Sequence, residues 1–209
     1  MVGGFGNPGT PFTLLNELVK QGQNELTIIK NDANESSIGI DKLIEKGRIK
    51  KYITSHIGLN RKLVEMMNTG QVEVEFFPQG ILAEKIRVGG SGFPGFLTDI
   101  GLDTEIIKQE DIIQWQGKRV KIEPALEADF TLIHAHQADT IGNLVYNKSA
   151  INFSPLMAMA ANFTIAEAHS IVQTGELIPE HIHTPFAFVD SVVKANSESS
   201  DYNILEHHL

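Results

Sequence analysis

The sequence predicts an α/β protein with a central, mostly parallel sheet, helices on both faces, and a small antiparallel hairpin region. Two observations predict this fold: short apolar runs of strand type alternate with amphipathic helical segments, and a later segment carries hairpin turn signals. The chain has 209 residues, of which 42% are hydrophobic and 21% charged, a composition typical of globular proteins. We expect a single domain over residues 1–194, followed by a tail over residues 195–209.

The first half of the chain alternates predicted helices with predicted strands. Met1-Val2 is typical of the last residues of a strand that enters a glycine loop, so we expect that an upstream helix and part of this strand are missing from the sequence. Thr10 and Pro11 favour a helix start, and Gly22 favours its end. The predicted elements are helix 12–21, strand 26–29, helix 41–46, strand 51–55, helix 59–68 and strand 71–76.

The second half is more varied. A helix is expected over residues 78–87, and the glycine-rich stretch 89–95 is expected to be irregular. Residues 105–123 are typical of antiparallel hairpins, with Gln116-Gly117 as one turn. The remaining predictions are strands 130–135, 144–147, 163–168 and 186–193 and a buried helix 154–162.

Charge and composition exclude several classes of function. The chain has 17 basic and 26 acidic residues, a net charge of −9, so we expect neither nucleic acid nor a membrane as a partner. It has no cysteine, which excludes disulfides and thiolate chemistry and fits a cytoplasmic location. Neither a signal peptide nor a membrane-spanning run is visible. The segment 205–208 is typical of a cloning junction that runs into a tag.

A glycine loop near the start is the first candidate site. Gly4-x-Gly6-x-x-Gly9 matches the dinucleotide-binding pattern at a strand-to-helix junction, and Asp32 follows near the position of a ribose-binding acid. Pro8 removes one backbone donor from this loop. The pattern therefore favours another phosphate or acyl ligand over NAD.

Two histidine pairs are the second candidate. His134-x-His136 and His181-x-His183 each place two imidazoles on one face of an extended segment, and together they could form a zinc site. The alternative is that the four side chains are unrelated and have backbone partners. We favour that alternative and expect no metal.

Polar residues that follow apolar strands are the third candidate. Asn31, Ser55-His56 and Gln79 each stand at the carboxyl end of a predicted strand, where parallel sheets bind ligands. Gln79 lies between Pro78 and Gly80, and its amide can donate to an oxyanion without titrating. The residues indicate a pocket, but none of them is a convincing nucleophile.

Three blocks of sequence resemble the signatures of family I coenzyme A transferases, and the resemblance runs from Gly3 to about Val193. The resemblance is closest to the alpha subunits of acetate/butyrate–acetoacetate CoA-transferases, whose pattern Ser55-His56-Ile57-Gly58 also fits. The blocks are Gly3-Gly4-Phe5-Gly6-Asn7-Pro8-Gly9-Thr10-Pro11, then Phe77-Pro78-Gln79-Gly80 through Gly89-Gly90-Ser91-Gly92, and Asp129-Phe130-Thr131-Leu132-Ile133 through Gly142-Asn143 and Ala150-Ile151-Asn152-Phe153.

The resemblance implies half of an enzyme. A beta subunit, usually in an A2B2 heterotetramer, supplies the nucleophilic glutamate in a Ser-Glu-Asn-Gly motif that this chain lacks. CoA would move between a short-chain acyl-CoA and a carboxylate by ping-pong turnover, with coenzyme A as a substrate and no permanently bound cofactor. By motif position, Gln79 is the oxyanion donor, Asn31 an active-site amide and Phe5 an apolar wall. The loop assigned to CoA binding is Gly3, Gly4, Phe5, Gly6, Asn7, Pro8 and Gly9.

One segment departs from the family pattern. Relatives carry Thr-Pro-Thr-Gly where this chain has Thr98-Asp99-Ile100-Gly101, and Asp103 stands where glycine is usual. We expect this added negative charge near the site to affect the choice of acid. Two alternatives stay open: one half of a succinyl-CoA:3-oxoacid CoA-transferase and, more remotely, a dinucleotide-binding oxidoreductase module.

Overall fold

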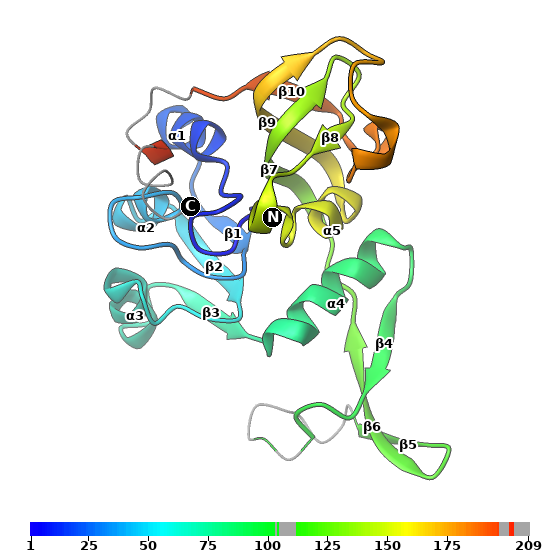
Figure 1. The fold of residues 1–209 in the computed structure, drawn as a ribbon. Coiled ribbons are helices and arrows are strands. Elements are labelled where there is room, and N and C mark those ends of the chain that lie inside the picture. Colours follow the sequence, from blue (N-terminus) through cyan, green and yellow to red (C-terminus); the bar gives the residue numbers. More distant parts are fainter. Residues whose placement is uncertain (103, 105–111, 197–200, 203–209) are drawn as a thin grey trace.

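The first half of the chain alternates strands and helices around a parallel sheet (Figure 1). The computed structural model describes residues 1–102, 104, 112–196 and 201–202. Three strands pair in the order β1-β2-β3. The elements of this half are α1 (Phe12–Gln21), β1 (Leu26–Ile29), α2 (Asp41–Glu45), β2 (Ile49–Thr54), α3 (Arg61–Asn68), β3 (Glu73–Phe76) and α4 (Gln79–Gly90). The predicted bounds of α1 and β1 are confirmed, and Gly22 ends α1 with φ +86°.

The second half contributes a mixed sheet in the order β10-β9-β7-β8, in which only β8 is antiparallel to its neighbour. Strands β7 and β9 are twelve residues long each, so they extend well beyond the predicted strands 130–135 and 163–168. The elements are β7 (Ala128–Asp139), β8 (Leu144–Val145), η2 (Lys148–Ile151), α5 (Ser154–Met159), β9 (Ala161–Val172), η3 (Pro179–His181), η4 (Phe186–Phe188) and β10 (Ser191–Lys194).

The first residues of the chain join the two sheets. Val2 forms a parallel bridge with Leu132 of β7, and its N–H donates to Ile29 O of β1 at 2.9 Å. Gly3 N–H donates to Leu132 O at 2.9 Å. Val2 therefore lies as a very short strand between β1 and β7, and the two sheets continue into one mostly parallel sheet. The prediction that Met1-Val2 ends a strand before a glycine loop is confirmed.

Helices cover both faces of this sheet, as predicted. Alternate residues of a strand point to opposite faces, so neighbours in β1 belong to different cores. Ile28 packs in the core made with α1, α2 and α3, whereas Ile29 packs in the core made with α4 and α5. Tyr52 and Ile53 of β2 divide in the same way.

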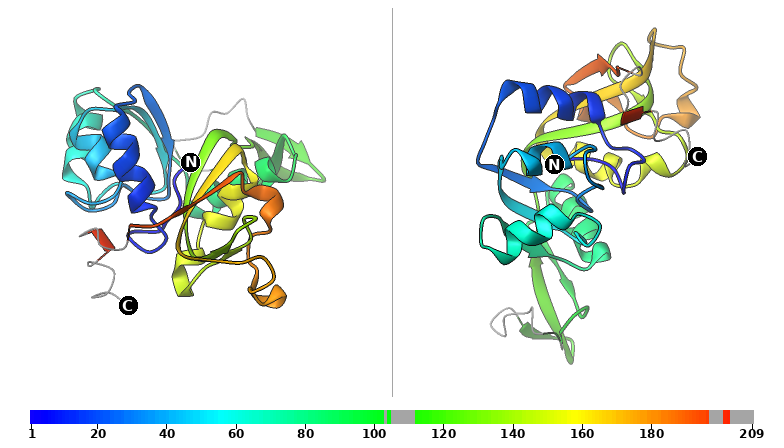
Figure 2. Two further views of the ribbon diagram at one scale, coloured as in Figure 1. Left: turned by 90° about the horizontal axis from the view of Figure 1, so that it is seen from above. Right: turned by 90° about the vertical axis from the view of Figure 1, so that its left-hand side faces the viewer.

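A three-stranded antiparallel arm projects from the body (Figures 1 and 2). Its strands are β4 (Gly95–Thr98), β5 (Ile112–Trp115) and β6 (Lys118–Pro124), in the order β4-β6-β5. Gln116 and Gly117 form the tight turn with φ of +49° and +77°, which is the geometry of a type I′ hairpin. The predicted turn is confirmed, and residues 105–111 of the predicted hairpin segment lie outside the described residues.

The prediction of a strand over residues 186–193 is wrong in its first half. Pro185 starts a 3-10 turn, in which Phe188 N–H bonds to Pro185 O and Val189 N–H bonds to Phe186 O. These donors are used locally, so pairing with β9 begins only at Ser191.

Helix α1 receives its N-terminal acceptor from β9. Its N-cap residue, Pro11, makes no side-chain capping bond, and the Leu14 N–H donates instead to Glu167 Oε2 at 2.9 Å. The other carboxylate oxygen of Glu167 accepts hydrogen bonds from His134 Nδ1 and the Tyr202 hydroxyl. The fully buried Glu167 thereby satisfies a first-turn N–H that has no partner within the helix.

Part of the segment expected to be a tail contacts the domain. Asp201 pairs with Lys42 at 2.6 Å, and the Tyr202 ring packs edge-on against Phe12 at 5.2 Å.

Within the described ranges, no helix has both the length and the apolar character that crossing a membrane requires.

The prediction of an irregular stretch over residues 89–95 is wrong at its ends, because α4 continues to Gly90 and β4 begins at Gly95, whereas residues 91–94 are irregular as predicted. A side chain at Gly89 would collide with the Leu126 carbonyl oxygen, and a Cβ at Gly90 would lie 2.6 Å from Met159 Cβ. The two glycines therefore serve close packing of the helix.

Gly89→Ala is expected to lower the free energy of unfolding by about 1–3 kcal/mol, the usual cost of overpacking a core. Gly80 lies in the same helix with open space around its Cβ position, so Gly80→Ala is the matched control. We expect the control to be neutral or stabilising by up to about 1 kcal/mol. Urea denaturation of both variants measures the difference, and equal stabilities would contradict the packing role of Gly89.

Candidate functional site

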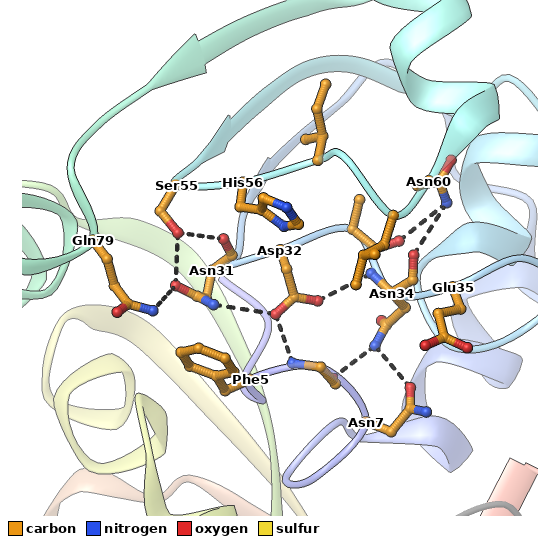
Figure 3. Close-up of a pocket in the computed structure, with 14 residues that line it drawn as sticks. Phe5, Asn7, Asn31, Asp32, Asn34, Glu35, Ser55, His56, Asn60 and Gln79 are labelled. Atoms are coloured by element: carbon orange, nitrogen blue, oxygen red, sulfur yellow. Dashed lines mark hydrogen bonds between the residues drawn. The ribbon is translucent and has the colours of Figure 1, made fainter.

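A pocket of about 310 Å³ opens at the carboxyl ends of β1, β2 and β3 (Figure 3). The glycine loop before α1 and the loop after β1 form its walls. It is lined by Phe5, Gly6, Asn7, Asn31, Asp32, Ala33, Asn34, Glu35, Ser55, His56, Ile57, Leu59, Asn60 and Gln79.

Three polar side chains predicted to share this edge are in direct contact (Figure 3). Asn31 follows β1, Ser55 follows β2, and Gln79 opens α4 after β3. Asn31 Oδ1 accepts hydrogen bonds from Ser55 Oγ and from Gln79 Nε2, both at 2.9 Å. The expectation that the ends of parallel strands bring these residues together is confirmed.

Beneath these amides lies a buried ion pair. Lys30 Nζ is 3.3 Å from Asp32 Oδ1, and the Lys30 side chain is completely buried. The Asp32 carboxylate also accepts the backbone N–H of Gly6 at 2.7 Å, that of Asn34 at 3.0 Å, and Asn31 Nδ2 at 3.2 Å. Burial alone would raise the pKa of Asp32, but the Lys30 ammonium and these N–H donors together lower it below its ordinary value.

The predicted CoA loop is only partly on the pocket wall. Phe5, Gly6 and Asn7 line the pocket, whereas Gly3, Gly4, Pro8 and Gly9 shape the loop outside it. Gly4 has φ +103°, and a Cβ there would lie 2.5 Å from Thr10 Oγ1. A Cβ at Gly9, whose φ is +80°, would lie 2.6 Å from the Ala150 carbonyl oxygen. These two positions therefore require glycine for the loop's own conformation.

Two of the backbone donors that a dinucleotide pyrophosphate would need from this loop are already used within the protein. Phe5 N–H bonds to Pro8 O at 3.1 Å, and Gly6 N–H bonds to the Asp32 carboxylate. Asp32 is therefore a partner of the loop rather than a free acid for a ribose, contrary to that alternative.

The histidines do not form the zinc site that the sequence left open. His134 bonds to Glu167 through Nδ1 at 2.9 Å, and His183 Nδ1 accepts a backbone N–H at 3.1 Å. His136 stacks on His169 at 5.9 Å. In the part of the chain that the structure describes, no three His, Asp or Glu side chains gather closely enough to hold a metal ion.

Asp99 does not line the pocket; it follows β4, which belongs to the projecting arm. The expectation that its charge lies near the site is wrong for this pocket, because the arm carries the segment away from the carboxyl ends of β1–β3 (Figure 1). Asp103 lies outside the described residues.

Sequence reasoning missed the residues that hold the loops together. Asn34 Nδ2 donates to Gly6 O at 2.8 Å, and its Oδ1 accepts Ile40 N–H at 3.2 Å. Asn60 caps α3 through Leu63 N–H at 2.8 Å. For Asn34 the signal was the Asn- and Asp-rich composition after β1, since such side chains bond readily to nearby backbone. For Asn60 it was an asparagine directly before a helix, where this residue type is a preferred N-cap.

Comparisons with known proteins agree with the sequence motifs. Residues 1–195 match the family model described as coenzyme A transferase. The alpha subunit of a probable coenzyme A transferase of Bacillus subtilis (strain 168) is 49% identical over 93% of this chain and 86% of its own length. The alpha subunit of the acetate CoA-transferase of Escherichia coli (strain K12) is 45% identical over 92% of this chain and 88% of its own length.

Solved structures share the fold. An acyl-CoA transferase from E. coli O157:H7 in a thioester complex with CoA has a TM-score of 0.81 and 21% identity, over 96% of this chain but only 44% of that longer chain. Glutaconate CoA-transferase from Acidaminococcus fermentans has a TM-score of 0.80 and 20% identity, over 94% of this chain and 70% of that one. The predicted family and fold class are confirmed.

Asp32→Asn is expected to lower the free energy of unfolding by about 3–5 kcal/mol at neutral pH, because it leaves Lys30 buried without a counter-charge. The folded-state pKa of Asp32 lies below its unfolded value, so this stabilisation is present above the unfolded pKa. It is lost as the pH falls through the folded pKa, and the two proteins then converge.

Denaturant titrations between pH 7 and pH 3 measure this difference. The exposed pair Lys50–Glu25 at 3.7 Å is the control, and Glu25→Gln should change the free energy of unfolding by no more than about 1 kcal/mol. A difference between Asp32→Asn and wild type that is independent of pH would show that the charge of Asp32 is not what stabilises the fold.

Proposed function

Because this chain belongs to the coenzyme A transferase family, we propose that it is the alpha subunit of an enzyme that moves CoA between a short-chain acyl-CoA and a carboxylic acid. The observation that carries the proposal is the Gln79 amide, held by Asn31 beside the pocket. Acetate, butyrate and acetoacetate are the acids we propose. A succinyl-CoA:3-oxoacid enzyme is the second candidate, since relatives named as the corresponding half of succinyl-CoA:3-ketoacid coenzyme A transferases are 40–41% identical to this chain.

The proposed reaction uses a glutamate from the beta subunit for nucleophilic attack. Its carboxylate attacks the thioester carbonyl of acyl-CoA, which forms an acyl-glutamyl anhydride and releases CoA thiolate. The thiolate then attacks the glutamyl carbonyl, forming a glutamyl-CoA thioester as the first carboxylate leaves. An incoming carboxylate reverses the two steps and leaves as the new acyl-CoA. CoA is thus a substrate, and the scheme needs no permanently bound cofactor.

Each of these steps passes through a tetrahedral oxyanion. The amide nitrogen of Gln79 carries two N–H groups, of which one is donated to Asn31 Oδ1. The other is free of that bond and can donate to an oxyanion in the pocket, where a donor placed in advance stabilises the developing charge. The exposed position of Gln79 suits contact with a reacting group brought by the partner subunit.

The glycine loop is proposed to contact CoA. Phe5, 51% exposed, presents an apolar wall to the pocket, and Asn7 places a polar side chain on the same side. We propose a cytoplasmic location, with which the lack of cysteine agrees. We also propose an A2B2 complex with a beta subunit, since the relatives are named as alpha subunits.

CoA transfer from acetyl-CoA to butyrate or acetoacetate is expected from this chain co-purified with its beta subunit, and not from this chain alone. The reason is that the nucleophile lies in the partner. The measurement is acyl-CoA formation by both samples at equal concentration of this chain. Transfer by this chain alone would contradict the division of the site between two subunits.

Gln79→Ala is expected to lower kcat of the complex by about 10- to 1000-fold, the usual effect of removing one oxyanion donor. Gln71→Ala is the control, because Gln71 is an exposed glutamine that precedes β3 and bonds to Thr69 instead. Size-exclusion chromatography should show that both variants still assemble. Turnover of Gln79→Ala at the rate of Gln71→Ala would remove Gln79 from the mechanism.

A further inference from the structure

We propose that Ser55 and Asp32 are positioning residues, which act through Asn31 to make Gln79 present an N–H rather than a carbonyl oxygen to the reacting group. The inference rests on the proposed function, because it concerns the donor that Gln79 supplies there. It follows from the direction of each hydrogen bond in the chain Asp32–Asn31–Gln79 (Figure 3).

The direction is set at Asp32. Its carboxylate carries acceptor oxygens only, and donors surround it: Lys30 Nζ at 3.3 Å, Gly6 N at 2.7 Å and Asn34 N at 3.0 Å. Asn31 can therefore approach only with its NH2 group, as it does at 3.2 Å. A reversed amide would put two oxygens against each other beside a buried charge.

Asn31 carries this hydrogen-bond orientation from Asp32 to Gln79. With Nδ2 toward Asp32, its Oδ1 must face the opposite side, where Ser55 Oγ and Gln79 Nε2 occupy it at 2.9 Å each. Asn31 is only 2% exposed, and its backbone oxygen is also bonded to the hydroxyls of Thr54 and Ser55. The side chain is thus held at both ends and at its backbone.

The orientation of Asn31 determines which atom of the Gln79 amide faces Asn31 and which remains for the pocket. Since Asn31 Oδ1 can only accept, Gln79 must contact it through nitrogen, and the second N–H of the same planar group stays available to the pocket. Without this constraint the Gln79 amide could turn over, and its oxygen would repel an oxyanion where its nitrogen attracts one.

Ser55 acts on this arrangement rather than on the substrate. Its single hydroxyl hydrogen is directed at two oxygens of Asn31, the backbone O and Oδ1, both at 2.9 Å. Ser55 shares Asn31 Oδ1 with Gln79, so the hydroxyl engages one lone pair of that oxygen and leaves the other for Gln79 Nε2. Removal of the hydroxyl should loosen the orientation of Asn31 and Gln79 while leaving the pocket walls in place.

The experiment is a double-mutant cycle in the complex with the beta subunit. Ser55→Ala should lower kcat about 10-fold, corresponding to one lost hydrogen bond, with KM for acyl-CoA unchanged. In the Gln79→Ala background the same change should lower kcat less than about 2-fold, because the group that Ser55 positions is gone. Ser55→Thr, which keeps the hydroxyl, should restore turnover. Ser91→Ala is the control, since its hydroxyl bonds to Arg87 O at the far end of α4.

Equal losses of kcat from Ser55→Ala in both backgrounds would overturn the proposal, and so would a loss confined to KM. A second measurement does not depend on activity. In the full chain, Ser55→Ala should shift the side-chain amide NMR signals of Gln79 but not those of Gln71. Unshifted Gln79 signals would overturn the positioning role even where the complex turns over. A different result would contradict the proposed function alone: the wild-type complex would transfer no CoA, although Ser55→Ala shifts the Gln79 signals as expected.

Discussion

Most of the site depends on a buried pair of opposite charges at the carboxyl end of β1. Lys30 also donates to Gly4 O at 3.4 Å, and Asp32 accepts Gly6 N–H, so the pair holds the glycine loop against the strand. Two desolvated charges are costly unless each finds several partners. That requirement explains why loops from distant parts of the sequence converge at this point, and it fixes the backbone from which the pocket amides project.

The fold could be predicted where local signals decide the structure. The predicted bounds of α1 and β1 agree with the structure at every residue, because a left-handed glycine at Gly22 ends the helix and an apolar run defines the strand. The end of α4 could not be predicted, since glycine ordinarily disfavours a helix, and only the approach of Leu126 and Met159 shows why glycine occupies positions 89 and 90 of this helix. Contacts of this kind are invisible in the local sequence.

The candidate site could also be predicted only in part. The common edge of Asn31, Ser55 and Gln79 follows from strand order alone, because parallel strands end on the same side of their sheet. The burial of Lys30 does not follow, because a lysine at the end of a short strand is ordinarily solvated. Nor could the sequence show which loop residues line the pocket, since this depends on bonds such as Phe5 N–H to Pro8 O.

The first turn of α1 and the short strand at Val2 both depend on partners made much later in the chain. Leu14 and its acceptor Glu167 are 153 positions apart, and Val2 pairs with Leu132. During synthesis, which runs from the N-terminus, the first half must therefore wait for β7 and β9 before it is complete. Until then Val2 has no strand partner on the side that faces away from β1, and an unpaired edge of this kind is open to pairing with another chain.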